Sequence, residues 1–249
     1  MHPLLHRIRQ KIWKEVRRPF CRFAPASPVP VFHHIPKCGG TSVIDILRDW
    51  FITIEDYRTS WTTQHPPLKD LRPLRSCNCL CGHFELEGVH LHQRYPDVLA
   101  SPRYKIFTFI RDPLQLQLSL FRYERKHNVR SITLEEHLRL RPNYIASILP
   151  ATADNYREVL DRYFFVGILE ERQLSLDVLA VLLGKPRKKF PWINRTRDTS
   201  DSPGRPTPLS DEVVTRFKHD NELDYRIYEY CVERFRRQVD SLADKLPVD

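Results

Sequence analysis

The sequence predicts an α/β protein with a mainly parallel sheet and helices on both of its faces. Three short apolar runs, 31–35, 104–110 and 163–168, are each followed by a segment whose apolar residues have helical spacing. Such runs are typical of strands buried on both faces, and strands that alternate with helices favour a parallel sheet. Ligands of these sheets bind at the carboxyl ends of the strands, so the residues after each run are the first functional candidates.

The first run is followed by a loop with the composition of an anion-binding site. Its members are Pro36, Lys37, Cys38, Gly39, Gly40, Thr41 and Ser42. Glycines let backbone amides approach a ligand closely, and the helix that follows directs its free amides and positive dipole end at the same point. A lysine and two hydroxyls add a charge and donors. The segment therefore predicts a cradle for phosphate or sulfate.

The order of residues in this loop differs from that of a Walker A loop. In a Walker A loop the lysine follows the glycines and a hydroxyl is placed for magnesium, whereas here Lys37 precedes Gly39 and Gly40. The loop instead resembles the 5′-phosphosulfate loop of sulfotransferases that use 3′-phosphoadenosine 5′-phosphosulfate (PAPS). The resemblance is to their carbohydrate branch, which includes heparan sulfate 2-O-sulfotransferases. An ordinary Pro-Gly turn between a strand and a helix is the alternative.

The run 104–110 ends in a second motif, Arg111-Asp112-Pro113, and Ser119 follows eight residues after Arg111. Proline favours the first position of a helix, and the planar guanidinium of arginine suits a phosphate dianion. A strand end, Arg-Asp-Pro and a serine at this distance resemble the 3′-phosphate motif of PAPS sulfotransferases. An Arg-Asp ion pair that caps the helix is the alternative.

A further predicted strand, 77–83, carries cysteines at alternate positions and ends in a histidine. Because residues two apart share a face of a strand, Cys77, Cys79 and Cys81 are predicted to face the same side as His83. We predict no metal here, since structural zinc sites pair two Cys/His knuckles and the sequence has no second one. Small buried thiols are the simpler interpretation.

His83 is the predicted general base. In heparan sulfate 2-O-sulfotransferases a His-Gly-His segment stands at the matching place, and its second histidine is the base. The present Cys81-Gly82-His83 keeps that histidine and replaces the first, which indicates a different acceptor sugar. Rival candidates are Glu85 and Glu87, further along the same face, and His34, which precedes the anion-binding loop.

The resemblance spans about residues 30–235 and implies a P-loop-type fold that transfers a sulfo group from PAPS to a hydroxyl of a carbohydrate or glycoconjugate. His83 and Lys37 are the implied catalytic residues, and residues 36–42, Arg111 and Ser119 are the implied nucleotide-binding residues. No metal is expected, because lysine and backbone amides can stabilise the charge on the leaving phosphate. The alternatives are a P-loop-like small-molecule kinase and a non-catalytic polyanion-binding protein.

Composition adds a basic surface and a prediction about the thiols. Lys and Arg exceed Asp and Glu by 40 − 31 = 9, which favours polyanionic ligands, but no nucleic-acid-binding signature supports DNA or RNA as a partner. No apolar run is long enough to cross a membrane, so we predict a soluble, cytoplasmic protein. The six cysteines form no obvious disulfide framework, and we expect reduced thiols.

Two domain segments are predicted, a basic extension with a Pro-rich linker over 1–30 and one catalytic domain over 31–249. Residues 1–20 alternate cationic and apolar groups, as in an amphipathic helix that lies on a membrane surface or packs against the domain. The remaining predictions are an irregular loop at 52–76, helices at 41–51, 131–162 and 170–183, a loop at 184–208, and two helices between 209 and 246. Basic residues within 58–75 and 185–189 suggest an anionic acceptor.

Overall fold

The computed structural model describes residues 3–57, 66–84, 90–191 and 209–247, and the side chains of these from residue 8 onward. Its centre is a five-stranded sheet in the order β2-β3-β1-β4-β5, and all four pairings are parallel. The strands are β1 Val29–His33, β2 Ile52–Asp56, β3 Asn78–Gly82, β4 Tyr104–Ile110 and β5 Phe165–Ile168. The predicted parallel α/β architecture is confirmed.

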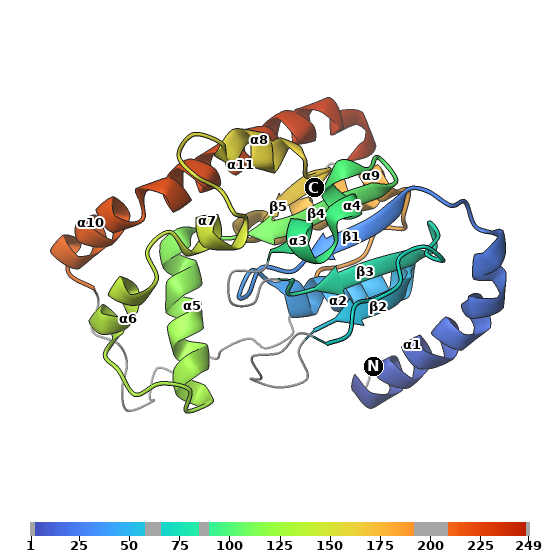
Figure 1. The fold of residues 1–249 in the computed structure, drawn as a ribbon, viewed down its shortest axis with the longest axis horizontal. Helices are drawn as coiled ribbons and strands as arrows, with labels where there is room; N and C mark the ends of the chain where they lie inside the picture. The colour runs from blue at the N-terminus through green and yellow to red at the C-terminus, as the bar shows by residue number, and fades with distance from the viewer. Residues whose placement is uncertain (1–2, 58–65, 85–89, 192–208, 248–249) are drawn as a thin grey trace.

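Helices cover both faces of the sheet. In Figure 1, α3 and α4 lie in front of the sheet, α2 and α9 lie behind it, and α11 crosses above β5. The α-helices are α1 Pro3–Arg17, α2 Gly40–Trp50, α3 Leu91–Arg94, α4 Pro96–Ala100, α5 Pro113–Lys126, α6 Leu134–Leu140, α7 Tyr144–Ile148, α8 Tyr156–Asp161, α9 Arg172–Leu183, α10 Asp211–Asp220 and α11 Glu222–Ser241. The 3₁₀ helices are η1 Arg18–Phe23, η2 Leu169–Glu171 and η3 Ala243–Lys245. Within the described residues, no helix is both long and apolar enough to span a membrane.

In this strand order β1 is the central strand, and the direction in which strands are added to the sheet reverses beside it. From β1 the chain builds β2 and β3 on one side, and then β4 and β5 on the other. In the register, His33 lies opposite Gly82 of β3, and Phe32 lies opposite Phe107 of β4. The carboxyl ends of β3, β1 and β4 are therefore neighbours, which is where open α/β sheets bind ligands.

The apolar runs form the core as their composition predicts. Each of the strands β1 and β3 is buried along its whole length, and the rings of Phe32 and Phe107 stack across the sheet with centroids 5.3 Å apart. Helices lie on both faces of the sheet, which explains why the runs are continuously apolar instead of alternating.

Several element boundaries differ from the sequence prediction. The predicted loop 52–76 begins with the edge strand β2, whose burial is incomplete and whose sequence lacks a long apolar run. Strand β1 starts at Val29, inside the predicted linker, and the predicted helical stretch 131–162 is three short helices, α6, α7 and α8. The predicted loop residues 58–65 and 192–208 lie outside the described part of the chain. The division of the chain at residue 30 stays a prediction.

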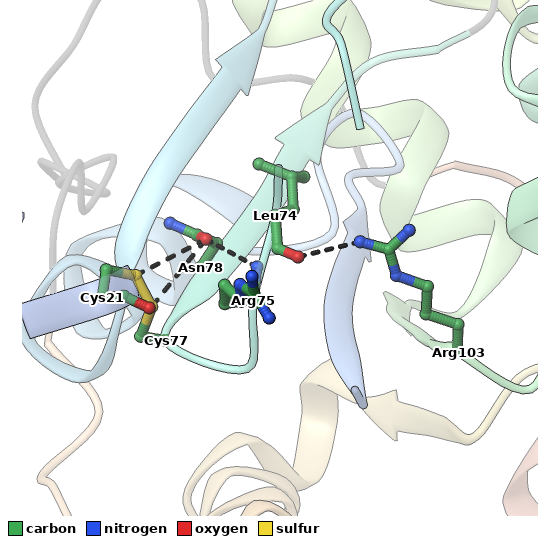
Figure 2. Close-up of a disulfide and its surroundings, with 6 residues drawn as sticks. All are labelled: Cys21, Leu74, Arg75, Cys77, Asn78 and Arg103. Carbon is green, nitrogen blue, oxygen red and sulfur yellow. Dashed lines mark hydrogen bonds between the residues drawn. A yellow bond between two sulfur atoms is a disulfide. The ribbon is translucent and has the colours of Figure 1, made fainter. Parts of the chain in front are cut away.

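The expectation of reduced thiols is wrong for two of the six cysteines. Cys21, in η1, forms a disulfide with Cys77, which directly precedes β3, and their Cα atoms lie 5.9 Å apart (Figure 2). Nearby, the Asn78 side chain accepts a hydrogen bond from the Arg75 amide at 2.8 Å, and Arg103 donates to the carbonyl of Leu74 at 2.8 Å. The partners are 56 residues apart, so spacing alone gave no signal of this pair.

The other cysteines are buried thiols, as the sequence suggested. Cys79 and Cys81 are fully buried on β3 with their sulfur atoms 3.7 Å apart, and Cys38 and Cys231 are also buried. Burial raises the pKa of the Cys81 thiol well above its ordinary value. Among the described residues, no group of three or more His, Cys, Asp or Glu side chains could hold a metal ion.

Candidate functional site

Three of the predicted segments converge at the carboxyl edge of the sheet. The anion-binding loop follows β1, His83 follows β3, and Arg111 follows β4. Because these three strands are adjacent in the order β3-β1-β4, the loop lies between His83 on one side and Arg111 on the other. Segments separated by some 70 residues of sequence thus meet at one site.

The loop after β1 has the backbone of an anion cradle. Lys37 and Gly39 adopt left-handed conformations with φ of 64° and 79°, and for Gly39 the absence of a side chain removes the steric penalty. The first helical hydrogen bonds of α2 run from the amides of Ser42 and Val43 to the carbonyl of Gly39, at 3.0 and 3.2 Å. The amides of the first two residues of α2, Gly40 and Thr41, have no acceptor within the helix by its geometry, and the positive dipole end of the helix points into the loop.

Cationic groups gather around this loop. The pKa of Lys37 is lowered, first by burial and then by the charge of Arg111, with Lys126 adding to the effect. Its ammonium group lies 4.4 Å from the centre of the Tyr123 ring on α5. Cations held this close repel one another, and a bound dianion would offset that cost. Lys37 and Arg111, predicted as parts of one nucleotide site, therefore lie together.

Arg111 lies close to an acidic residue that follows another strand. Its Nε lies 3.9 Å from Oε1 of Glu170 in η2, which follows β5, and the same oxygen accepts a hydrogen bond from the Asp112 amide at 3.2 Å. The Asp112 side chain caps α5 by accepting from the amide of Gln115 at 2.9 Å. Asp112 is thus the helix cap that the sequence allowed, while Arg111 pairs with Glu170 instead of Asp112.

Ser119 lies on α5 four residues before Tyr123. Residues at this spacing share one face of a helix, so Ser119 and the ring that contacts Lys37 lie on the same side of α5. Lys126 extends that face by one more turn. The sequence reasoning missed Tyr123 and Lys126, although their positions four and seven residues after Ser119 were a usable signal.

The remaining loop residues have different surroundings. Pro36 is half-buried and Thr41 is exposed, whereas Cys38 is buried and burial raises its pKa, so any contact of Cys38 with a ligand would come from its backbone. The hydroxyl of Ser42 donates to the carbonyl of Pro191 at 2.8 Å. In this structure Ser42 therefore joins the loop to the segment after α9.

The geometry of His83 fixes which ring nitrogen can act as a base. Its Nδ1 lies 2.6 Å from the backbone carbonyl oxygen of His34. A carbonyl oxygen only accepts hydrogen bonds, so Nδ1 carries the proton. In the neutral ring the basic lone pair is then on Nε2, as a general base requires. His83 is half-buried, directly after Gly82, where β3 ends.

His34 supports this arrangement. Its ring stacks on that of His83 with centroids 4.1 Å apart, and its Nδ1 lies 3.1 Å from the Tyr57 hydroxyl. Burial, followed by the neighbouring charges of His83, His33 and Lys37, lowers the pKa of His34 well below its ordinary value, so this ring is neutral near pH 7. The ring also occupies the space at Gly40, where an added Cβ would lie 1.8 Å from Nε2 of His34.

Packing against the His34 ring therefore requires a glycine at position 40. The rival bases Glu85 and Glu87 lie outside the described residues. Within the basic run 185–189, Lys188 pairs with Asp49 at 2.9 Å, Arg187 pairs with Asp177 at 2.8 Å, and Lys185 lies over the Phe51 ring. Lys189 is exposed, and the anionic acceptor stays a prediction.

Together the fold and the edge of the sheet define a P-loop-type α/β protein with a glycine-containing loop between β1 and α2. No family model matches the chain, and no curated protein matches it. Among solved structures, a sulfotransferase from Alicyclobacillus acidocaldarius matches with a TM-score of 0.50 and 17% sequence identity, over 84% of this chain and 98% of that chain. The chain therefore shares its fold with a sulfotransferase.

Proposed function

We propose that this protein is a PAPS-dependent sulfotransferase whose acceptor is a carbohydrate hydroxyl. The observation that carries the proposal is the convergence of three chemically different segments at the ends of β3, β1 and β4. They supply an imidazole, a glycine-containing loop with a lysine, and an arginine. The fold shared with a solved sulfotransferase supports the class of reaction, and the resemblance of the two sequence motifs supports PAPS.

The described residues fit a nucleotide with two separate anionic ends. The loop amides, the start of α2 and Lys37 suit the 5′-phosphosulfate, because they form a compact cradle of donors with a positive charge. Arg111 and Ser119 suit the 3′-phosphate, since both come from the β4–α5 segment and Arg111 lies close enough to Lys37 to perturb its pKa. A bound dianion would offset the burial and the neighbouring charge of Arg111, which together lower the pKa of Lys37.

In the proposed reaction PAPS supplies the sulfo group: the acceptor oxygen bonds to sulfur while the bond from sulfur to the bridging phosphate oxygen breaks. Nε2 of His83 takes the proton of the acceptor hydroxyl, because Nδ1 is committed to the His34 carbonyl. Lys37 and the loop amides stabilise the negative charge that grows on the leaving phosphate. Oε1 of Glu170 lies 3.9 Å from Nε of Arg111, next to the proposed position of the 3′-phosphate.

The Cys21–Cys77 disulfide argues against the cytoplasmic location that the sequence predicts. Disulfides form and persist mainly in oxidising compartments. We therefore place the reaction, as part of this proposal, in a compartment that permits disulfides.

The nucleotide is tested by thermal denaturation. Adenosine 3′,5′-bisphosphate should raise the melting temperature, because a ligand that binds only the native state stabilises it, and AMP should do so much less for want of a 3′-phosphate. Arg111→Ala should remove most of the difference between the two nucleotides. Equal stabilisation by AMP, or by ATP with magnesium, would favour the kinase alternative.

The reaction is tested by mass spectrometry of a glycan panel incubated with PAPS. The proposal requires a gain of one sulfo group on an acceptor. The protein could instead bind a sulfated polysaccharide and transfer no sulfo group to any glycan or small hydroxyl metabolite tested. That outcome would favour the polyanion-binding alternative.

A further inference from the structure

Large apolar side chains are exposed in one region near the N-terminus. Of the eight exposed large hydrophobic residues in the described chain, six lie between residues 8 and 23. They are Ile8, Ile12, Trp13 and Val16 of α1, and Phe20 and Phe23 of η1. Their exposed fractions run from 43% to 73%, and an apolar groove is lined by the four residues of α1 together with Arg9. Contiguous exposed apolar surface of this kind marks an interaction site.

This helix is attached to the domain by its polar side. Gln10 Nε2 donates to the carbonyl of Asp45 at 2.9 Å and to the Asp49 carboxylate at 3.2 Å, both on α2. Arg17 donates to the carbonyl of Asp49 at 2.9 Å, and Lys14 reaches the carbonyl of Thr53 in β2 at 3.3 Å. The usual orientation of a surface helix, apolar side inward, is reversed, so the apolar side faces away from the sheet.

Cationic residues border this outward apolar face. Arg9, Lys11, Arg18 and Arg22 are exposed between residues 9 and 22, where Glu15 is the single acidic residue. The Arg17 guanidinium lies 4.5 Å from the Trp13 ring and that of Arg22 lies 4.6 Å from the Phe23 ring. Apolar side chains, interfacial aromatics and a basic border are the features of helices that lie in the headgroup region of an anionic membrane.

We propose that residues 8–23 form a docking surface for an anionic lipid membrane. A second copy of this chain fits less well, because two faces bordered by cations would repel each other on contact. Anionic headgroups instead neutralise the border while the acyl region receives Ile12, Trp13 and Phe20. This inference does not depend on the proposed function, since none of these residues belongs to the candidate active site.

The disulfide joins the docking surface to the sheet. Cys21 lies between Phe20 and Phe23, and its bond to Cys77 fixes η1 at the start of β3. With the contacts of Gln10 and Arg17 to α2, the surface is held at both ends. A membrane bound here would therefore keep the protein in a defined orientation instead of tethering it by a flexible arm.

The test is sedimentation of the full chain with vesicles of phosphatidylcholine, alone and mixed with phosphatidylglycerol. The protein should bind the anionic vesicles, and bind them less as salt is added, because salt screens the attraction of exposed charges. Ile12→Gln/Phe20→Gln should weaken vesicle binding at least about tenfold, since two apolar side chains can no longer be buried. Brominated lipids should quench Trp13 fluorescence, and this quenching should be missing in Trp13→Phe.

The matched control is Leu68→Gln/Leu140→Gln, which removes two exposed leucines elsewhere and should leave vesicle binding unchanged. An equal loss in this control would overturn the proposal, as would no binding to anionic vesicles at low salt. A lipid-free dimer that Ile12→Gln/Phe20→Gln dissociates would assign the face to a second copy. If the protein binds a soluble sulfated polysaccharide but no vesicles, the cationic residues of this surface would instead be assigned to binding that polymer. None of these outcomes tests the proposed sulfo transfer.

Discussion

At the scale of single residues, the candidate site depends on the pair of stacked histidines. His34 supplies the carbonyl that fixes the tautomer of His83 and the ring that supports it, and Gly40 leaves the space that this ring needs. A larger residue at position 40 would displace His34, and with it the orientation of His83. One glycine therefore serves the geometry of the base as well as the approach of an anion.

The base is tested by His83→Ala. The variant should lower kcat by roughly 10²–10⁴-fold, because a general base acts in the chemical step, while the affinity for adenosine 3′,5′-bisphosphate should hardly change. The acidic limb of the pH profile of kcat/KM should also disappear. His219→Ala, which removes an exposed histidine on α10, should leave kcat unchanged. Near-normal turnover of His83→Ala, with loss of turnover in Glu85→Gln or Glu87→Gln, would show that the base is wrongly assigned.

The role of Lys37 differs from that of His83. Lys37→Ala should weaken binding of adenosine 3′,5′-bisphosphate and also lower kcat, because its charge is close to the anion both before and during transfer. Isothermal titration and steady-state kinetics measure the two effects separately. A variant that loses turnover but binds the nucleotide as tightly as the wild-type protein would confine Lys37 to the chemical step.

At the scale of elements, α7 and α11 cap each other. The carboxylate of Asp224 on α11 accepts from the amides of Ile145 and Ala146 at 2.9 and 2.8 Å. In return, the side-chain oxygen of Asn143 accepts from the Asp224 amide at 3.2 Å. Burial nevertheless raises the pKa of Asp224 to about 6, because removing the charge from water costs more free energy than the two amide hydrogen bonds supply.

This raised pKa predicts a dependence of stability on pH. The native state holds the proton of Asp224 more tightly than the unfolded state, because the pKa of this carboxyl is about 6 in the native state and 3.8 in the unfolded chain. The contribution of Asp224 to the free energy of unfolding is therefore full below about pH 4 and is lost as pH rises through about 6. A difference of about 2 pKa units corresponds to about 3 kcal/mol. Urea unfolding from pH 4 to 7 should show this loss in the wild-type protein relative to Asp224→Asn. Asp240→Asn replaces an exposed carboxylate on the same helix and keeps Asp224, so it should lose stability over this pH range as the wild-type protein does. A pH-independent difference between Asp224→Asn and the wild-type protein would refute the linkage.

At the scale of the whole molecule, the disulfide joins the N-terminal segment to the sheet. It closes a long loop, because its partners are 56 residues apart, and the parts it joins are α1–η1 and the strand next to β1. A cross-link over a loop of this length stabilises chiefly by restricting the unfolded chain, typically by 2–4 kcal/mol, in the chain-entropy account.

Removal of the disulfide should therefore lower the free energy of unfolding by about 2–4 kcal/mol. The measurement is urea unfolding with and without dithiothreitol. The double variant Cys21→Ser/Cys77→Ser should match the reduced protein and should not respond to the reductant. If the wild-type protein is equally stable in both conditions, and peptide mapping finds both thiols free, the disulfide does not form in solution.

The sequence by itself determined the features that depend on short stretches of chain. Continuous apolar runs indicated β1 and β4, and the lysine, glycines and hydroxyls of residues 37–42 indicated a strand-to-helix loop suited to an anion. The order of strands and helices indicated a parallel sheet with a site at its carboxyl ends. The inferences about strands, helices and the parallel sheet succeed because periodicity, glycine conformation and helix starts depend on neighbours a few residues apart. The anion and the position of the site stay predictions.

Only the tertiary structure decided the partners of groups that are distant in sequence. It paired Cys21 with Cys77, stacked His34 on His83, placed Glu170 beside Arg111, and paired Arg187 with Asp177 and Lys188 with Asp49. It also turned the apolar side of α1 outward, which its helical spacing could not reveal. The type of a side chain limits which groups it can bind. Which of those groups lies within reach depends on how the whole chain folds around its core.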